Sequence, residues 1–227
     1  MRKFFVTGTD TNIGKTYITL EMIKFFTRQN LRVVGIKPVA SGCYQYKGLL
    51  LNEDALLLQA HSTVTIPYHK INPFSFEPPI APHIADKKGI LTTEEIYSKY
   101  KDILTEDLDM LFVEGVGGWC VPINKKETMA DFVKKADLDV IVVVGMRLGC
   151  LNHSILTVES ILARSVRVSG WIANCFDTEM ESLSENIESL KEILQIPFLG
   201  KLDSGTITDG SDLASSLMMF REGGLSA

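Results

Sequence analysis

The residues best suited to chemistry lie in a glycine-rich segment near the start of the chain. Residues 8–16 read GTDTNIGKT, between an apolar run and a segment of helical period. In such a turn the backbone N–H groups and the helix dipole favour an anion, Lys15 can reach the β- and γ-phosphates of a nucleotide, and Thr16 can offer its hydroxyl to Mg²⁺. The spacing GxxxxxGKT is one residue longer than the common pattern. We therefore predict a variant phosphate-binding loop, because a chance Gly-Lys-Thr would rarely fall between a strand and a helix.

A carboxylate stands where a bound metal would need one. Glu114 ends the apolar run MLFVE and is followed by Gly115, Val116, Gly117 and Gly118. An acidic residue at the carboxyl end of a buried parallel strand points into the crevice where such sheets bind ligands, and its oxygens suit Mg²⁺. The glycines allow the backbone to approach a ligand closely. The weaker alternative is a strand-end glutamate that faces solvent.

Three further residues suit anion or metal binding, but their positions leave simpler interpretations open. Lys37 ends a predicted strand before a proline, so its ammonium could face an anionic substrate or a phosphate in transfer. A surface lysine fits that position equally well. Ser41, four residues later, could orient the same anion or simply occupy a turn. Asp54 lies at the start of a predicted helix, where an acidic residue is expected to complement the dipole.

The elements that must position these residues are short β-branched runs alternating with segments of helical period, which indicates a parallel sheet in an α/β fold. The predicted strands are Lys3–Thr7, Arg32–Lys37, Met110–Glu114, Val140–Val144, Val168–Ala173 and Phe198–Leu202. The predicted helices run from Gly14 to about Gln29, begin at Thr92, and lie near Ala55–His61, Asn152–Ala163 and Glu181–Leu194. Several strands are apolar on both faces, as strands between two helical layers must be. The proline-rich segment Ile66–Pro82 is predicted to be an ordered irregular loop.

Composition and charge limit the class of protein. The chain has 227 residues, 45% hydrophobic and 22% charged, which indicates one globular domain rather than a disordered or fibrous chain. Its net charge of −5 and pI of about 5.4 disfavour a nucleic-acid partner. The cysteines form no CxxC pair and the histidines no HExxH spacing, so a zinc site has little support. No secretory signal or membrane span is predicted, and free thiols in the cytoplasm are expected.

Six blocks of the sequence together resemble the dethiobiotin synthetase family. They read FFVTGTDTNIGKT, GIKPVASG, NEDALLLQ, FVEGVGGWCVPI, VVVGMRLGCLNH and GWIAN, and they follow the family's order from Phe4 to Asn174. The resemblance implies one P-loop NTPase-like domain over residues 1–227, a three-layer α/β sandwich with a mainly parallel sheet, which forms a homodimer. It implies an ATP- and Mg²⁺-dependent cyclo-ligase of biotin biosynthesis. The implied reaction converts 7,8-diaminononanoate, CO₂ and ATP into dethiobiotin, ADP and phosphate through a carbamate and a carbamic–phosphoric anhydride.

The resemblance also implies roles for particular residues. The implied catalytic residues are Lys37, Lys15 and Thr11. The implied Mg²⁺ ligands are Thr16, Asp54 and Glu114. The implied ATP-binding residues are Asn12, Ile13, Gly14, Lys15, Thr16, Tyr17, Asp54, Glu114, Gly115, Val116, Gly117, Asn174 and Cys175, with Asn174 expected to contact adenine. The implied substrate-binding residues are Ser41, Gly118, Gly149, Cys150, Leu151 and Asn152. The last four, at a helix N-terminus, are expected to receive the substrate's carboxylate from the neighbouring subunit.

The chain departs from the family pattern at a few positions. Residue 12 is Asn where the family often has Glu, which bears on a phosphate or amine contact. After Gly200 the chain reads Lys201-Leu202-Asp203-Ser204, where members commonly have a proline-rich turn that helps enclose adenine. Cys175 stands where relatives often have Asp. The last two departures bear on which base the site accepts.

Two other classes of protein are alternatives, and the first of them shares the variant loop. Partition- or division-type ATPase switches usually carry an extra lysine early in the loop, whereas residues 9–11 here are Thr-Asp-Thr. Those proteins also commonly have a basic or amphipathic surface, which the charge of −5 does not favour. Amide-forming ATP-dependent ligases of cobalamin synthesis would normally bring a glutaminase domain, for which 227 residues leave no room.

Overall fold

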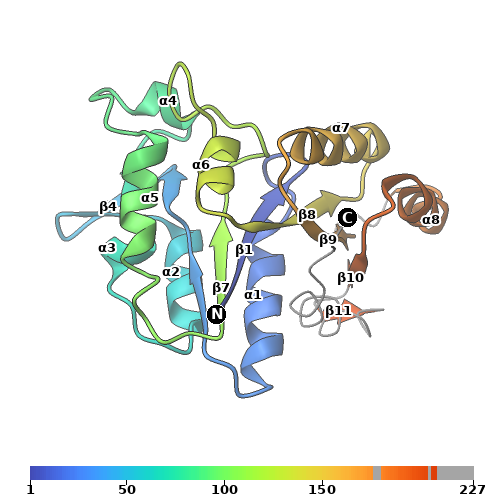
Figure 1. Cartoon of the computed structure of the whole chain (residues 1–227), viewed down its shortest axis with the longest axis horizontal. Helices are drawn as coiled ribbons and strands as arrows, with labels where there is room; N and C mark the ends of the chain where they lie inside the picture. Colours follow the sequence, from blue (N-terminus) through green and yellow to red (C-terminus); the bar gives the residue numbers. More distant parts are fainter. Residues whose placement is uncertain (176–179, 204–205, 209–227) are drawn as a thin grey trace.

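A seven-stranded sheet forms the centre of the molecule in a computed structural model that describes residues 1–175, 180–203 and 206–208 (Figure 1). The strands are β1 (Arg2–Gly8), β2 (Val33–Ile36), β7 (Met110–Glu114), β8 (Asp139–Gly145), β9 (Val168–Asn174), β10 (Phe198–Asp203) and β11 (Thr206–Thr208). Their order is β11-β10-β9-β8-β1-β7-β2, and every pairing is parallel except that of β10 with β11. All six strands predicted from sequence are confirmed.

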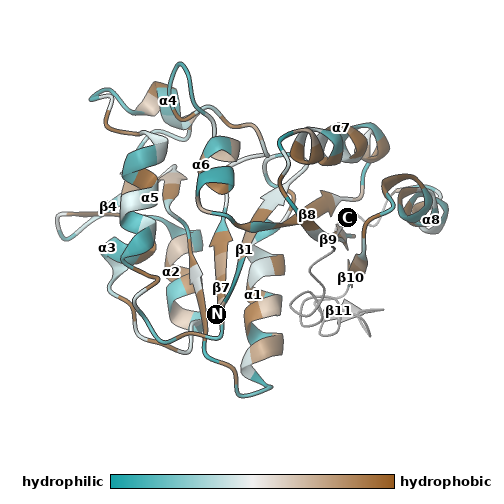
Figure 2. Ribbon diagram, viewed as in Figure 1, coloured by the Kyte–Doolittle hydropathy of each residue, from teal (hydrophilic) through white to brown (hydrophobic). Residues whose placement is uncertain are grey.

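Alternate residues of each strand point to opposite faces of the sheet, so apolar side chains emerge on both faces and helices cover both. Phe4 and Val6 pack with α1 (Lys15–Thr27) and with Leu58 of α2 (Glu53–His61), whereas Phe5 faces the larger core on the other side. That core contains residues of α5 (Thr93–Lys101), α6 (Met129–Lys135), α7 (Cys150–Ala163) and α8 (Leu183–Leu194). Figure 2 shows hydrophobic stretches along the central strands and both hydrophobic and hydrophilic residues along the helices. The predicted three-layer α/β sandwich with a mainly parallel sheet is confirmed.

The helix signals in the sequence identify the right segments. Ile18, Met22 and Phe26 of α1 are buried, and the helix ends at Thr27 rather than near Gln29. At α5 the Thr92 hydroxyl accepts a hydrogen bond of 3.1 Å from the Glu95 N–H, as its capping position predicts. Within the described residues, none of the helices combines the length and apolarity that crossing a bilayer requires.

The stretch between β2 and α5 contains more regular structure than predicted. It holds β3 (Val39–Ser41), β4 (Tyr44–Tyr46), β5 (Leu49–Leu51), α3 (Tyr68–Ile71), β6 (Phe74–Phe76) and α4 (Pro82–Ala85). The prediction of an irregular loop at Ile66–Pro82 is therefore wrong, although the segment is ordered. Pro67 is the N-cap of α3 and Pro82 is the first residue of α4. The backbone N–H groups at these positions take no part in helical hydrogen bonds, so a proline fits there. The β3 strand pairs in parallel with β6, which places Ser41 opposite Phe76.

Candidate active site

A cavity of about 780 Å³ opens at the carboxyl ends of β1, β2 and β7. Residues 11–17 of the glycine-rich loop form one wall, and Lys37, Ser41, Asp54 and Glu114 contribute polar groups to the others. Parallel strands end at the same edge of the sheet, which is why residues so far apart in sequence meet there. An apolar wall of Leu57, Pro79, Ile80 and Pro82 completes the cavity, and sequence reasoning missed it. The prolines of residues 66–82 were the available signal for this wall.

The glycine-rich loop is built around one buried side chain. Ile13 fits between the ends of β1 and β8, where a Cβ at Gly8 would lie 2.4 Å from its Cδ1 and a Cβ at Gly145 would lie 2.8 Å from its Cγ2. Asn12 and Gly14 on either side have φ of 56° and 83°, in the left-handed region. Gly14 is the N-cap of α1, so the loop leads directly into the helix N-terminus. This is the geometry of a phosphate-binding loop.

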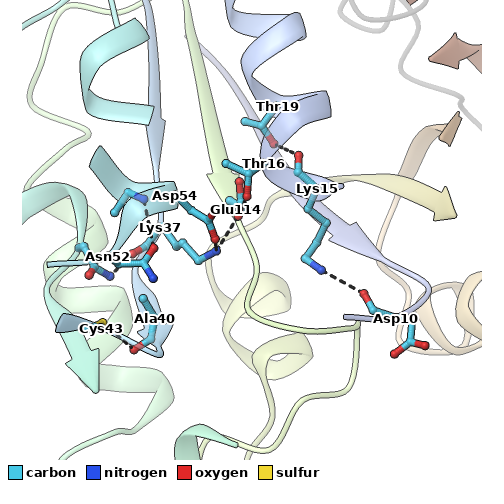
Figure 3. Close-up of polar contacts among 12 residues, drawn as sticks. Asp10, Lys15, Thr16, Thr19, Lys37, Ala40, Cys43, Asn52, Asp54 and Glu114 are labelled. Atoms are coloured by element: carbon cyan, nitrogen blue, oxygen red, sulfur yellow. Dashed lines mark hydrogen bonds and ion pairs between the residues drawn. The ribbon is translucent and has the colours of Figure 1, made fainter. Parts of the chain in front are cut away.

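Lys15 turns its ammonium back over the loop. Its Nζ donates to the main-chain oxygen of Asp10 at 3.0 Å (Figure 3). Burial is the main reason that the pKa of Lys15 falls to about 8, although the carboxylate of Glu114 opposes that shift. A buried ammonium with one neutral acceptor gains strongly from an anion, so the Lys15 end of the cavity favours phosphate.

A second lysine lies among acidic residues at the other end of the cavity. Lys37 Nζ is 2.5 Å from Asp54 Oδ2 and 2.7 Å from Glu114 Oε1, and the Thr16 hydroxyl donates to the same Glu114 oxygen at 2.8 Å (Figure 3). Lys37 is only 6% exposed and Glu114 is fully buried, so the surface-lysine and solvent-facing glutamate interpretations are wrong. Burial alone would lower the pKa of Lys37, but the carboxylates of Glu114 and Asp54 outweigh it and raise that pKa. Lys37 is therefore a buried, protonated cation.

The oxygens of Thr16, Asp54 and Glu114 fit a magnesium ion. One hydroxyl and two carboxylates are hard donors, and the buried Oε2 of Glu114 has no hydrogen-bond partner among the described residues. In the part of the chain that the structure describes, no three His, Cys, Asp or Glu side chains are grouped so that they could hold a metal ion by themselves. The site is thus short of protein ligands, as expected for an ion that takes its other oxygens from phosphates and water. Asp54 begins α2 as predicted, yet it also contacts Lys37.

Smaller groups complete the cavity between the two lysines. Thr11 and Ser41 line it, and the Ser41 hydroxyl is buried without a hydrogen-bond partner among the described residues. Gly117 has φ of 63°, and a Cβ there would lie 3.5 Å from the Thr11 hydroxyl and 3.0 Å from a methyl of Val121. Tyr17 and Val116 also line the cavity. Most of the predicted residues around β1, β2 and β7 therefore share one space, but Gly118 and Gly115, which is packed against the ring of Phe5, do not line it.

Comparison with known proteins places the chain in a family. A family model described as an AAA domain matches residues 2–210. An ATP-dependent dethiobiotin synthetase of Pseudoalteromonas translucida is 42% identical over 88% of both chains, and one of Alteromonas mediterranea is 40% identical over 96% of this chain and 98% of its own. The chain belongs to the dethiobiotin synthetase family. Membership makes it an enzyme of the ligase class.

Solved structures agree with this fold but show nothing finer. The MinD cell division protein of Aquifex aeolicus matches with a TM-score of 0.56 and 16% identity, over 96% of this chain and 86% of its own. Chloroplast FtsY from Physcomitrella patens matches with a TM-score of 0.53 and 13% identity, over 96% of this chain and 65% of its own. At such identities the likeness concerns the P-loop fold alone. It therefore does not favour a division-type switch over a dethiobiotin synthetase.

Another group of residues expected from the dethiobiotin synthetase resemblance lies outside the cavity. Gly149 caps α7, which begins at Cys150 rather than near Asn152, and none of residues 149–152 lines the cavity of its own chain. Asn174 and Cys175, at the end of β9, do not line it either. Of the segment expected near adenine, Lys201–Asp203 ends β10, while Ser204 lies outside the described residues.

Proposed function

We propose that the chain is the ATP- and Mg²⁺-dependent dethiobiotin synthetase of biotin biosynthesis. It would convert 7,8-diaminononanoate, CO₂ and ATP into dethiobiotin, ADP and phosphate. The observation that carries this proposal is the pair of buried lysines, Lys15 and Lys37, that face one cavity with a buried carboxylate between them, in a member of this family. The proposed reaction joins two anions, so it needs positive charge on both sides of the transferred group.

The proposed sequence of steps follows from the chemistry of a carbamate. One amine of the substrate adds to CO₂ and loses a proton to give a carbamate, whose negative charge makes its carbon a poor electrophile. A carbamate oxygen then attacks the γ-phosphorus of ATP, and ADP leaves. The neighbouring amine attacks the carbon of the resulting anhydride, the bond to the phosphate oxygen breaks, and the ring closes with release of phosphate and a proton. Mg²⁺, when bound, supplies charge that neutralises phosphate oxygens.

The side chains around the cavity have distinct parts in this proposal. Lys15 binds the terminal phosphates from the loop side, and Lys37 holds the carbamate and the transferring phosphate against their mutual repulsion. Lys37 stays protonated, because its neighbours already raise its pKa. The hydroxyls of Thr11 and Ser41 orient the reacting end of the substrate.

The remaining part of the substrate is an apolar chain ending in a carboxylate. The wall of Leu57, Pro79, Ile80 and Pro82 suits the methylene groups. The carboxylate would meet the N-terminus of α7, residues 149–152, from a second copy of the chain, since those residues do not line their own cavity. The proposed enzyme is therefore a homodimer. It acts in the cytoplasm on small molecules, without a nucleic-acid or membrane partner.

One assay tests the function. ADP release is measured with and without 7,8-diaminononanoate and bicarbonate, and dethiobiotin is sought by mass spectrometry. We expect ADP formation to require both substrates and to match dethiobiotin one to one. ATP hydrolysis that is indifferent to both would contradict the proposal and favour a nucleotide-driven switch.

A further inference from the structure

The centre of the phosphate-binding loop is tied to a distant strand by one buried hydrogen bond. The side-chain Nδ2 of Asn174 donates to the main-chain oxygen of Ile13 at 2.6 Å, across 161 positions of sequence. Asn174 and Ile13 are each only 5% exposed. The strand β9 that carries Asn174 is separated from β1 by β8, so this contact reaches across a strand to the loop that follows β1. It is one of several long-range contacts of the loop, beside the Thr9 N–H bonded to the Val143 carbonyl and the Asp10–Arg147 ion pair.

Both partners are held in place by the surrounding structure. The main-chain oxygen of Asn174 accepts from the Met146 N–H at 2.9 Å, and Asn174 pairs with Gly145 on one side and Leu202 on the other. The Ile13 side chain is wedged against Gly8 and Gly145. The bond therefore joins two rigid points, and breaking it would leave a buried carbonyl without a partner.

The chemistry of the contact fixes the orientation of the Asn174 amide. A carbonyl oxygen only accepts hydrogen bonds, so the NH₂ group must face Ile13. The Asn174 Oδ1 is then a buried acceptor, and it has no partner among the described residues. Contact with adenine, the role that the family resemblance implies for Asn174, would use this free oxygen. The NH₂ group is already engaged with the loop.

The hydrogen bond also determines where the loop's N–H groups point. The C=O of Ile13 and the N–H of Gly14 belong to one planar trans peptide, in which they point in opposite directions. Both residues line the cavity. When Asn174 holds the carbonyl, the Gly14 N–H is turned away from Asn174, whereas a reversed peptide would present a carbonyl lone pair to bound phosphates. Gly14, with φ of 83°, has no Cβ that would oppose such a reversal.

We propose that Asn174 is a positioning residue of the phosphate-binding loop, which aims the Gly14 N–H at the nucleotide phosphates by holding the Ile13 carbonyl. This inference rests on the proposed ATP-dependent function. It differs from a contact with adenine in one measurable respect. A positioning residue affects every polyphosphate, including one that carries no base.

Tripolyphosphate is therefore the decisive probe. Its binding to the full chain with Mg²⁺ is measured by calorimetry for the wild type, Asn174→Asp and Ser169→Ala, beside ATP. Asn174→Asp keeps the shape and an acceptor but places an oxygen against the Ile13 carbonyl, so we expect about tenfold weaker binding of both ligands. Ser169→Ala removes a buried hydroxyl of the same strand that has no hydrogen-bond partner in the described part of the chain, and it should leave both affinities unchanged. Wild-type tripolyphosphate affinity in Asn174→Asp, with ATP binding weakened, would overturn the proposal in favour of a base contact alone.

A measurement on the wild type covers the case in which Asn174→Asp does not fold. In the ¹⁵N-labelled protein, tripolyphosphate should shift the Asn174 side-chain NH₂ signals together with the Gly14 amide, and absence of that response would overturn the proposal. Measurements on the wild type also distinguish failure of the proposed function from failure of the role proposed for Asn174. If it binds no tripolyphosphate and makes no dethiobiotin, the proposed function and this role fail together. If it does both while Asn174→Asp binds tripolyphosphate normally, only the role of Asn174 fails.

Discussion

The two halves of the sheet's carboxyl edge differ in how they meet the cavity. At β1, β2 and β7, charged side chains project into one space, and Lys37, Asp54, Glu114 and Thr16 form a single network. At β8 and β9, the residues expected from the family lie outside that cavity, and Asn174 contacts the loop through its hydrogen bond to the Ile13 carbonyl. In the proposed function, the half at β1, β2 and β7 would supply the phosphate and metal chemistry, whereas the half at β8 and β9 supports the loop and carries the N-terminus of α7.

The largest effect should come from removing the cation of the first half. Lys37→Ala should lower kcat by about 10²–10³-fold, because charge on the transferring group loses its main side-chain counterpart, while ATP affinity changes little. Steady-state kinetics with ATP titration measures both. Lys191→Ala, on the outer part of α8, is the matched control and should behave as the wild type. Equal losses of ATP binding and turnover would contradict the assigned role.

The same variant should reveal the network's part in stability. Without Lys37 the fully buried Glu114 lacks its ion-pair partner, which costs about 3–5 kcal/mol in the free energy of unfolding. Since the same oxygens suit Mg²⁺, the metal should restore part of that loss. Thermal unfolding of Lys37→Ala with and without Mg²⁺ tests both expectations. If the variant is as stable as the wild type in the presence of a chelator, the Lys37–Glu114 ion pair does not stabilise the fold.

The next largest effect should come from the proposed metal ligands. Glu114→Gln removes a charged ligand, so we expect the Mg²⁺ concentration for half-maximal activity to rise about 100-fold. Binding of Mn²⁺ in the presence of ADP, followed by electron paramagnetic resonance, gives a readout independent of turnover. Glu188→Gln on exposed α8 is the control. An unchanged Mn²⁺ affinity in Glu114→Gln would argue against Glu114 as a ligand.

The first half was more predictable from sequence than the second, for a physical reason. The loop, the apolar strand before Glu114 and the capped helices are local patterns, and parallel pairing then brings their ends together. Lys37 and Asp54 were ambiguous because burial is a tertiary property: nothing beside Lys37 in sequence shows that Glu114, 77 positions away, lies 2.7 Å from it. The bond from Asn174 to Ile13 and the β3–β6 pairing have no local signal at all. Helix α6 is too short to show a clear period, and its Thr128–Asp131 capping box was the missed clue.

A moderate effect should come from the helix N-terminus of the second half. Asn152→Asp puts a negative charge in the first turn of α7, where it suits the dipole but repels a carboxylate. We expect the KM for 7,8-diaminononanoate to rise about tenfold, with ATP affinity unchanged, and a smaller rise for Asn152→Ala. If the KM of Asn152→Asp matches that of the wild type, the carboxylate does not bind there.

Mixing variants tests whether α7 serves its own chain or a second copy. Lys37→Ala and Asn152→Asp chains are co-refolded in equal amounts. In mixed dimers, one site combines an intact Lys37 from one chain with an intact α7 from the other, so about one quarter of the sites should regain the wild-type KM. If α7 served its own chain, every Lys37-bearing site would carry the Asn152→Asp change, and no low-KM activity would return.

The smallest effect should come from the exposed contact that joins the two halves. Arg147, just before the N-cap of α7, forms an ion pair with Asp10 of the loop, and both side chains are nearly half exposed. Water and salt screen such a pair, so Arg147→Gln should change the free energy of unfolding by less than about 1 kcal/mol and leave tripolyphosphate affinity nearly unchanged. Urea unfolding at low and high salt measures the free energy of unfolding. The small difference between Arg147→Gln and the wild type should vanish at high salt. Only a desolvated contact is expected to hold the Ile13 peptide against a charged ligand. If Arg147→Gln lost as much tripolyphosphate affinity as is expected for Asn174→Asp, the loop would instead be positioned from its exposed side.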